Sequence, residues 1–192
     1  IRYITGESHN KKHPEKIYRV LDNMIPSEPD AMGVWNSMQL TLSRFRPVKN
    51  SVIRIELSPS SEHTKDFTIE DWQKLWQDFS TEFDKQVFKD KDGKIRNCPT
   101  NLANSKYTVW LHMESNSGVP HLHAAVCRMD EDGQINNDHN IHLRAQWAAE
   151  RVAKKRGWAT AKQVRNVNIP LVTRDCMNVL KSMSSWSWDE YK

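Results

Sequence analysis

The sequence predicts an α+β domain with a central, largely antiparallel β-sheet flanked by helices. Regular strand–helix–strand alternation is missing. Instead, helices are predicted at residues 30–43, 69–87 and 142–156, and strands at residues 52–58, 107–113 and 121–128. Neighbouring strands mixed irregularly with helices are typical of α+β folds, because short connections pair strands in antiparallel fashion.

Composition and length fit one soluble domain of ordinary size. The chain has 192 residues, of which 38% are apolar and 27% charged. No apolar run is long enough to cross a bilayer, and no signal peptide is recognisable, so we expect no membrane insertion. The three cysteines are far apart and form no CxxC pair, which predicts a reducing compartment and no zinc knuckle.

Two helices are predicted in the first quarter of the chain. Residues 14–24 carry Pro14 in the first turn, where proline is favoured, and apolar residues at helical spacing, Ile17, Leu21 and Met24. Residues 30–43 repeat this spacing with Met32, Trp35, Met38 and Leu42. Each segment therefore predicts a helix with one apolar face.

A half-buried strand is predicted at residues 52–58, because the spacing of apolar residues changes to two. Ile53, Ile55 and Leu57 would face one way, and the intervening polar residues the other. Pro59 ends this strand.

The clearest helical pattern covers residues 69–87. Thr68 and Asp71 resemble a capping box at its start, and one apolar stripe follows: Ile69, Trp72, Trp76, Phe79 and Phe83. We expect Trp72, Trp76 and Trp147 to lie in the core. Trp186 and Trp188, in a Ser-rich tail, could stack on bases or pack against a final turn.

The second half of the chain predicts two more strands and a basic helix. Strands at residues 107–113 and 121–128 flank a polar connection, and residues 130–133 form a turn. Residues 142–156 form a helix that Gly157 stops. The last twenty residues predict one more helix, with inward residues Cys176, Val179, Leu180 and Met183.

Three histidines gather around the polar connection. His121 and His123 are two apart on a strand, so they share a face, and His112 ends the strand that folds back beside them. Converging imidazoles are metal-ligand geometry, and three of them leave coordination positions open. Two structural interpretations of the histidines remain open. They could be hydrogen-bonded polar residues on a sheet face, or they could bind a metal with a purely structural role. A competing pair, His139 and His142, is spaced for one helix face but lacks a third partner.

The stretch from His112 onwards resembles a known family. Its pattern HxE…PHxH, followed by Ala-Ala-Val-Cys-Arg and by Asp-Glu-Asp-Gly at 130–133, is similar to the third motif of the mobilisation relaxases, a group of HUH endonucleases, and most of all to their MOB-P group. The family motif usually reads HxDxxxPHxH, so Glu114 replaces an aspartate and the spacer is longer here. The downstream basic helix and residues 54–60, similar to the second motif, extend the resemblance.

The resemblance implies an HUH relaxase-like fold over residues 1–192, with residues 142–192 a mainly helical C-terminal part. Relaxases commonly continue into further domains, so we expect an N-terminal fragment of a longer protein. The implied activity is that of a DNA relaxase, which nicks and rejoins one strand at a transfer origin. His112, His121 and His123 would hold one divalent ion, Mn²⁺ or Mg²⁺. Transition metals other than manganese are also possible, because imidazoles favour ions softer than Mg²⁺.

The family also implies a tyrosine nucleophile in a first motif near the N-terminus. The match is Arg2-Tyr3-Ile4-Thr5, which makes Tyr3 the candidate, with Tyr18 as the alternative. The tyrosine would form a 5′-phosphotyrosyl intermediate. Glu114 or Glu56 would orient a ligand or assist deprotonation of the tyrosine.

Two groups of basic residues are candidates for tracking the DNA strand. The net charge is only +4, but residues 142–165 hold seven Lys/Arg and one acid. Concentrated positive charge suits a phosphate backbone, and a solvated helix face is the other reading. The candidates are Arg44, Arg46, Lys49 and Arg54 in the first group, and Arg144, Arg151, Lys154 and Lys155 in the second.

The implied partners are single-stranded DNA at a transfer origin, accessory mobilisation proteins and a coupling protein. The implied location is the bacterial cytoplasm, from which the protein is transferred with the DNA. Three alternatives remain: a rolling-circle replication initiator or transposase of the HUH class, a metal-dependent hydrolase that uses water, and a non-catalytic DNA-binding module with a structural metal. A covalent DNA adduct separates the tyrosine enzymes from the other two.

Overall fold

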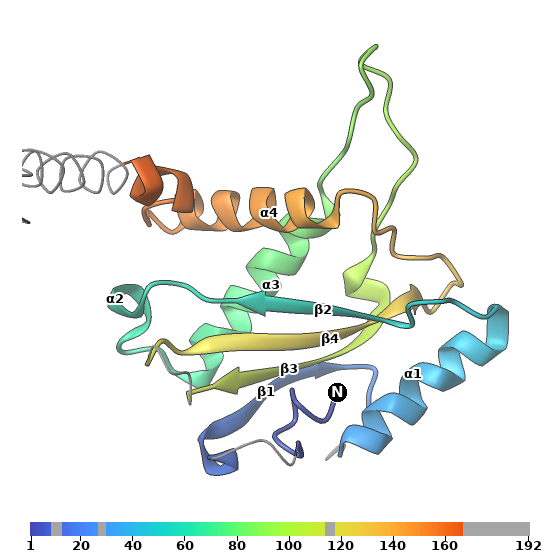
Figure 1. Ribbon diagram of the computed structural model, residues 1–192, viewed down its shortest axis with the longest axis horizontal. Coiled ribbons are helices and arrows are strands. Elements are labelled where there is room, and N and C mark those ends of the chain that lie inside the picture. The colour runs from blue at the N-terminus through green and yellow to red at the C-terminus, as the bar shows by residue number, and fades with distance from the viewer. Residues whose placement is uncertain (9–12, 27–29, 114–117, 167–192) are drawn as a thin grey trace, which may run out of the picture. The chain divides into compact units, whose positions relative to one another are not determined.

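The computed structural model describes residues 1–8, 13–26, 30–113 and 118–166. Contacts divide the chain into two compact units, Ile1–Val152 and Ala153–Lys192, and each is described by itself. The first unit contains a four-stranded antiparallel sheet in the order β1-β3-β4-β2 (Figure 1), which confirms the predicted fold class. In this order the strands are β1 (Ile17–Asn23), β3 (Ser105–His112), β4 (His121–Asp130) and β2 (Val52–Leu57).

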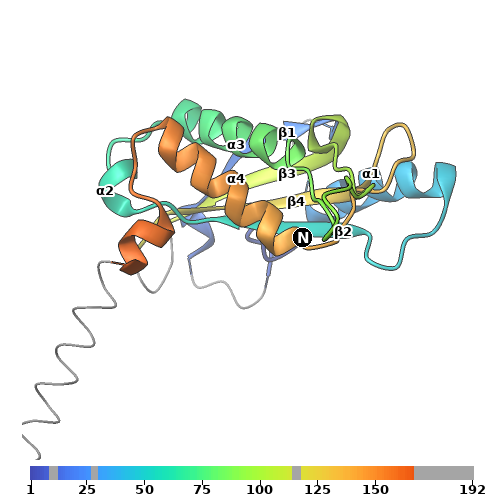
Figure 2. The ribbon, with the colours of Figure 1, turned by 90° about the horizontal axis from the view of Figure 1, so that it is seen from above.

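Helices cover both faces of this sheet. The main helices are α1 (Ala31–Phe45), α3 (Ile69–Asp84) and α4 (Ile141–Lys155), and shorter turns are η1 (Pro14–Lys16), α2 (Ser61–Thr64) and η2 (Leu102–Asn104). Seen from above, α3 and the first part of α4 lie side by side over the strands (Figure 2), where Arg144 of α4 donates to the Phe83 carbonyl of α3. We call this side the α3 face and the other the α1 face.

Each face has its own apolar core. On the α3 face, the buried rings of Trp76, Phe79 and Phe83 form a chain of aromatic contacts that reaches Tyr107 of β3. On the α1 face, a buried cluster joins α1 to β4 and to the N-terminal segment: Ile4, Val34, Met38, Leu42, Ala125, Cys127 and Met129. The two faces therefore draw on alternate residues of the same strands.

The helix α3 forms as its sequence predicts. The Thr68 hydroxyl accepts a hydrogen bond from the Asp71 amide at 3.3 Å, and the Asp71 carboxylate accepts one from the Thr68 amide at 3.0 Å. This capping box satisfies amide groups that the first turn would otherwise leave without partners. Of the predicted stripe, Ile69 is exposed in the first turn, whereas Trp72 and the later members are buried.

The predicted helix at residues 14–24 is wrong. Only Pro14–Lys16 form a helical turn, and Ile17–Asn23 form the edge strand β1, which pairs with β3 from Ile17↔His112 to Asn23↔Tyr107. A β-bulge between Arg19 and Leu21 interrupts the period-two alternation. The interrupted spacing of apolar residues imitates that of a helix.

The basic helix α4 is confirmed, and so is its end. Gly157 follows it with a positive φ of 69°, and its amide donates to the Lys154 carbonyl at 3.1 Å. Trp147 is not the core residue we expected: it is 38% exposed and packs against the ring of Phe88. The predicted final helix and the tail tryptophans fall on residues 167–192, outside the described part. None of the described helices is long and apolar enough to span a bilayer.

Candidate metal centre

Three buried histidines converge at one end of the sheet, on the α1 face. His112, the last residue of β3, pairs directly with His121, the first of β4, and His123 pairs with Trp110. Because directly opposite residues share a face and alternate residues along a strand do too, all three side chains project to the same side. One ring nitrogen of each lies within 4.8 Å of those of the others, and the ring centroids are 4.4 to 5.6 Å apart. The predicted convergence is confirmed.

Backbone carbonyls fix the orientation of two of the rings. Nε2 of His112 lies 2.8 Å from the Ile4 carbonyl oxygen, and Nδ1 of His121 lies 3.0 Å from that of Val119. A carbonyl oxygen only accepts hydrogen bonds, so these nitrogens are the donors, and Nδ1 of His112 and Nε2 of His121 are the ring nitrogens that would serve as metal ligands. Metal-binding histidines commonly donate their other N–H in this way.

The donor set fits a divalent metal ion. Two nitrogens bound tetrahedrally to one ion at about 2.1 Å are about 3.4 Å apart, so ring nitrogens that lie within 4.8 Å of one another need to approach by up to about 1.4 Å. Three neutral imidazoles suit a transition metal and leave room for water or substrate. Within the described part of the chain this is the one group arranged to bind a metal. His139, of the competing pair, is instead in contact with Arg96 and Asn140.

Tyr3 lies directly beside this triad. The N-terminal turn is held by a hydrogen bond from the Ile4 amide to the Ile1 carbonyl and by the buried Ile4 side chain. Since the Ile4 carbonyl also accepts from His112, the turn is tied to the metal site. The Tyr3 ring centroid is 5.7 Å from that of His112 and 5.4 Å from that of His123, and the side chain is 44% exposed. A substrate can therefore reach it from solvent.

Tyr18, the alternative nucleophile, lies on the other face of the sheet. It pairs with Leu111, the neighbour of His112 in β3, so its side chain projects away from the triad. It is 47% exposed and is a strand residue, not a helical one as predicted. Tyr107 is buried in the α3-face core. Among the tyrosines within the described ranges, Tyr3 is thus the one placed at the histidines.

A carboxylate and a guanidinium connect Tyr3 to the triad from β2. Glu56 pairs with His123 across the sheet, and its Oε2 lies 3.6 Å from Nδ1 of that histidine. The same oxygen lies 3.3 Å from Nη2 of Arg54, whose guanidinium carbon is 5.1 Å from the Tyr3 ring centroid. The sequence predicts separate roles for Glu56 and Arg54, and the alternation along residues 54–56 is the signal that places both on this face. Glu114 is one of the residues that are not described.

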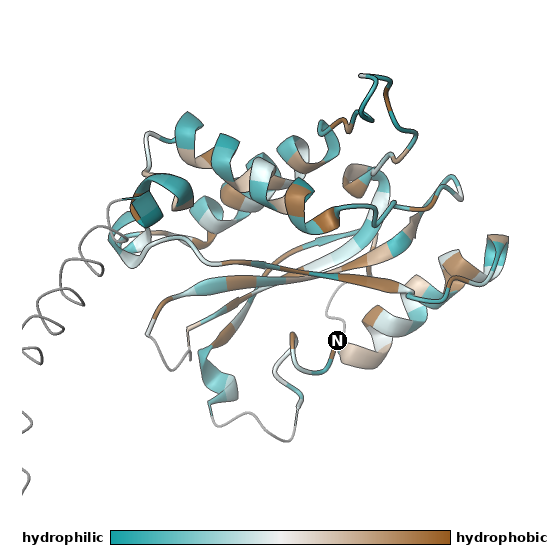
Figure 3. Cartoon of the chain, turned by 45° about the horizontal axis from the view of Figure 1, so that its top comes forward, coloured by the Kyte–Doolittle hydropathy of each residue, from teal (hydrophilic) through white to brown (hydrophobic). Residues whose placement is uncertain are grey.

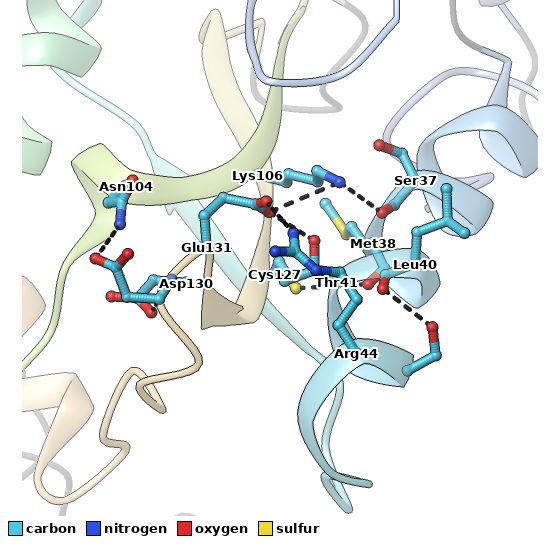
Figure 4. Close-up of polar contacts among 12 residues, drawn as sticks. Ser37, Met38, Leu40, Thr41, Arg44, Asn104, Lys106, Cys127, Asp130 and Glu131 are labelled. Atoms are coloured by element: carbon cyan, nitrogen blue, oxygen red, sulfur yellow. Dashed lines mark hydrogen bonds and ion pairs between the residues drawn. The ribbon is translucent and has the colours of Figure 1, made fainter.

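The first basic group divides between the two ends of the sheet. Arg54 belongs to the site, but Arg44 pairs with Glu131 at 3.2 Å, in a network that also engages Thr41 and Lys106 (Figure 4). Arg44 therefore helps to fix α1 against the end of β4. The exposed residues Arg46 and Lys49 lie in the connection that enters β2 at Val52. Val52 pairs with Cys127, six residues along β4 from His121, which corresponds to about 20 Å.

Arg144 is not available to DNA, and that prediction is wrong. Its side chain is fully buried, because it shares the inward stripe of α4 with Ala148 and Val152. Its Nη1 donates to the carbonyls of Phe83 and Gln86 at 3.0 and 2.8 Å, and its Nη2 donates to the Cys98 carbonyl at 2.7 Å. Burial lowers the pKa of this guanidinium. The group is a structural cross-link.

The rest of the second basic group lies away from the triad or in the second unit. Arg151 is exposed and 3.6 Å from Glu82 of α3, so it lies on the α3 face of the sheet, whereas the histidines lie on the α1 face. Lys154 and Lys155 are exposed at the end of α4 and belong to the second unit.

Comparison of the chain with protein-family models, with curated proteins and with solved structures gives no match. Its function is therefore inferred from the triad and the groups around it.

Proposed function

We propose that the chain is a metal-dependent endonuclease of the HUH relaxase type that cleaves and rejoins single-stranded DNA, with Tyr3 as the nucleophile. One observation carries the proposal: an accessible tyrosine ring lies within 6 Å of two of three histidines that can share a metal ion. A nucleophile beside an open metal position is the arrangement that phosphoryl transfer to a side chain needs.

The chemistry divides between the metal and the residues around it. A divalent ion on His112, His121 and His123, Mn²⁺ or Mg²⁺ in this proposal, would supply positive charge to a non-bridging phosphate oxygen. The Tyr3 oxygen loses its proton and bonds to phosphorus, while the bond from phosphorus to the 3′ oxygen breaks and that oxygen takes up a proton. One phosphodiester replaces another, so the reaction is close to energy-neutral and can run backwards to reseal the strand.

Neighbouring groups support this role for Tyr3. The Arg54 guanidinium over its ring keeps the ring in place and adds a positive charge where a phosphate would arrive. Glu56 contacts both Arg54 and His123, so it can orient a metal ligand and the cation together. Glu114 stays a prediction.

The substrate in this proposal is single-stranded DNA at a transfer origin, because a phosphate in regular duplex cannot approach a side chain that stands in a turn against a sheet. Accessory mobilisation proteins, a coupling protein and a site of action in the bacterial cytoplasm belong to the same proposal. A replication initiator or transposase of the HUH class would use the same chemistry on another DNA site.

The test is a denaturing gel of the protein incubated with Mn²⁺ and labelled single-stranded DNA from the transfer-origin region of its own element. Tyr18→Phe is the matched control for Tyr3→Phe, because the two tyrosines are similarly exposed on opposite faces. We expect an SDS-resistant adduct with wild type and Tyr18→Phe, and none with Tyr3→Phe or His121→Ala. Cleavage without any adduct would indicate a water-using hydrolase, and an adduct lost only in Tyr18→Phe would move the nucleophile.

A further inference from the structure

A basic hairpin, residues 88–96, extends from the first unit between α3 and β3. Two backbone hydrogen bonds join its legs, from the Asp90 amide to the Lys94 carbonyl and from the Arg96 amide to the Phe88 carbonyl, both 2.9 Å. Gly93 closes the turn with a positive φ of 79°. Figure 1 shows the hairpin as a green loop that stands away from the sheet and the helices. It is a two-stranded ribbon in which residues 89 and 91–96 are exposed.

The tip of this hairpin has an excess of positive charge. Its exposed cations are Lys89, Lys91 and Lys94, against two acids, Asp90 and Asp92. Arg96, also exposed, lies at the base opposite Phe88, where its Nη1 is 3.3 Å from Nε2 of His139. Asp90 is occupied by the turn, since its Oδ1 accepts from the amides of Asp92 at 3.0 Å and Lys94 at 2.9 Å. Ile95 is 65% exposed within a tip that is otherwise hydrophilic (Figure 3). This combination suits a polyanion with an apolar or base-edge surface between its charges.

The base of the hairpin is fixed by buried contacts. Arg144 donates to the Gln86 carbonyl before one leg and to the Cys98 carbonyl after the other, so one guanidinium joins both legs. Phe88 is buried, with the Trp147 ring centroid 5.3 Å away and the Arg144 guanidinium carbon 5.1 Å away. An isolated two-stranded ribbon is marginally stable in water. The buried base preorganises the hairpin, which lowers the entropy cost of binding.

We propose that the basic hairpin is a binding arm for duplex DNA. A two-stranded ribbon fits the major groove, which is about 12 Å wide, with lysines reaching phosphates on either side. Arg144 holds the base of the hairpin on the α3 face, whereas the triad lies on the α1 face at the His112 end of β3. Ser105, where β3 begins after the hairpin, is seven residues or about 23 Å along the strand from His112. The hairpin therefore contacts DNA beside the cleaved phosphate and not the phosphate itself. This proposal rests on the proposed function, because that function makes DNA the ligand.

The test measures the binding of the full chain to duplex DNA by fluorescence anisotropy, over a series of NaCl concentrations. The probes are a labelled duplex of about 20 base pairs with arbitrary sequence and one of its separated strands. The hairpin variant is Lys91→Ala/Lys94→Ala, and the matched control is Lys65→Ala/Lys74→Ala, which removes the same charge from exposed positions outside the hairpin. We expect the hairpin variant to bind the duplex about tenfold more weakly, with a salt slope lower by about two, and the control to bind like wild type.

Equal losses of duplex affinity in both variants, or an unchanged salt slope in the hairpin variant, would contradict the proposal that the hairpin binds duplex DNA. A loss as large on the single strand as on the duplex would overturn its assignment to duplex DNA. Failure of the nuclease proposal is distinguishable, because it shows as a missing adduct in wild type, whereas duplex binding is measured without cleavage. We expect His121→Ala to bind the duplex like wild type, and the hairpin variant to form the adduct on a short single strand.

Discussion

The guanidinium of Arg144 donates hydrogen bonds to oxygens that belong to the end of α3 and to the segment that precedes β3. A planar group with five donors can reach several carbonyls at once, which the ammonium group of lysine cannot do in the same plane. The positive charge of this residue therefore acts inside the protein, where it joins three segments, and contributes nothing to the outer surface.

Replacing Arg144 is expected to destabilise the first unit. Arg144→Ala leaves buried carbonyls without donors and opens a cavity, at a cost of about 3 kcal/mol in the free energy of unfolding. Arg144→Lys retains the charge but not the forked arrangement of donors, so we expect an intermediate loss in the free energy of unfolding. Urea unfolding followed by circular dichroism measures both. Arg151→Ala, an exposed position on the same helix, is the control, with an expected change below about 1 kcal/mol. Equal stability of all three variants would contradict the cross-link.

Glu56 is expected to affect metal binding without being a ligand. Its carboxylate lies 3.6 Å from His123, so Glu56→Gln removes the charge that orients and polarises this imidazole. We predict about tenfold weaker Mn²⁺ binding, measured by electron paramagnetic resonance titration of free Mn²⁺. Glu62→Gln, on the exposed turn α2, controls for the lost charge. Identical affinities for the two variants would assign Glu56 to ion pairing alone.

The sequence predicts the role of some residues correctly and of others incorrectly or not at all. The histidine triad follows from the spacing of its residues, whereas Tyr3 is only implied by the resemblance of residues 2–5 to a family motif. The fold places Tyr3 beside the triad. Arg144 was assigned from its charge, but its spacing of four from Ala148 and eight from Val152 marks the buried stripe of α4. The approach of Arg54 to Tyr3 joins positions about fifty residues apart, and no local pattern encodes such a contact.

At the scale of elements, α3 and β1 show when a local sequence pattern is sufficient to predict a helix or a strand. The start signal and the apolar stripe of α3 agree with each other, and the helix forms where they predict. In β1 the bulge changes the spacing of buried residues, and only pairing with β3 reveals the strand. Irregularities within a sheet depend on partners distant in sequence, so a single segment does not predict them.

The capping box of α3 gives a prediction for this helix. Thr68→Ala removes the hydroxyl that accepts from the Asp71 amide, and we expect a loss of about 1 kcal/mol in the free energy of unfolding. Thr81→Ala, exposed inside the same helix, should be neutral or slightly stabilising, because alanine has the higher helix propensity. Urea unfolding compares the two. A loss of equal size in both variants would show that the cap does not stabilise α3.

Asp84 at the end of α3 makes stability depend on pH. Burial is the largest cause of its raised pKa, which outweighs the hydrogen bonds it accepts from the amides of Leu102 and Ala103. A carboxyl group with a higher pKa in the folded state binds its proton more tightly there, so its contribution to stability is greatest below the usual value of 3.8 and is lost as pH rises through the folded-state pKa.

Asp84→Asn keeps a carbonyl acceptor but cannot ionise. We therefore expect the free energy of unfolding of wild type to fall, relative to that of Asp84→Asn, as the pH is raised from about 4 to about 7. Urea unfolding at several pH values measures this difference. Parallel curves for the two proteins would contradict the pKa shift at Asp84.

At the scale of the whole first unit, the sheet separates the metal site from much of the apolar core. The triad lies on the α1 face, whereas the aromatic core around Trp76 and the Arg144 cross-link lie on the α3 face. The α1-face cluster is also made of apolar contacts that need no metal. The fold therefore has cores on both faces that the metal does not have to complete.

Removal of metal is accordingly expected to leave the first unit folded. After treatment with a chelator, far-ultraviolet circular dichroism should be unchanged, and adding Mn²⁺ back at about 100 times its Kd should raise the free energy of unfolding by about 2.7 kcal/mol. Thermal unfolding with and without Mn²⁺ follows this change. Unfolding on chelation would instead favour the binding module with a structural metal.

The direct pairing of His112 with His121 has a consequence for how this site tolerates insertions and deletions. The spacing of the two ligands is set by the ladder between β3 and β4, and the connection of residues 113–120 only joins them. Lengthening a connection costs little free energy, since the closure entropy grows with the logarithm of its length. A single residue inserted between His121 and His123 would instead turn His123 to the opposite face. We therefore expect the triad to tolerate a change of length in the connection better than one within β4.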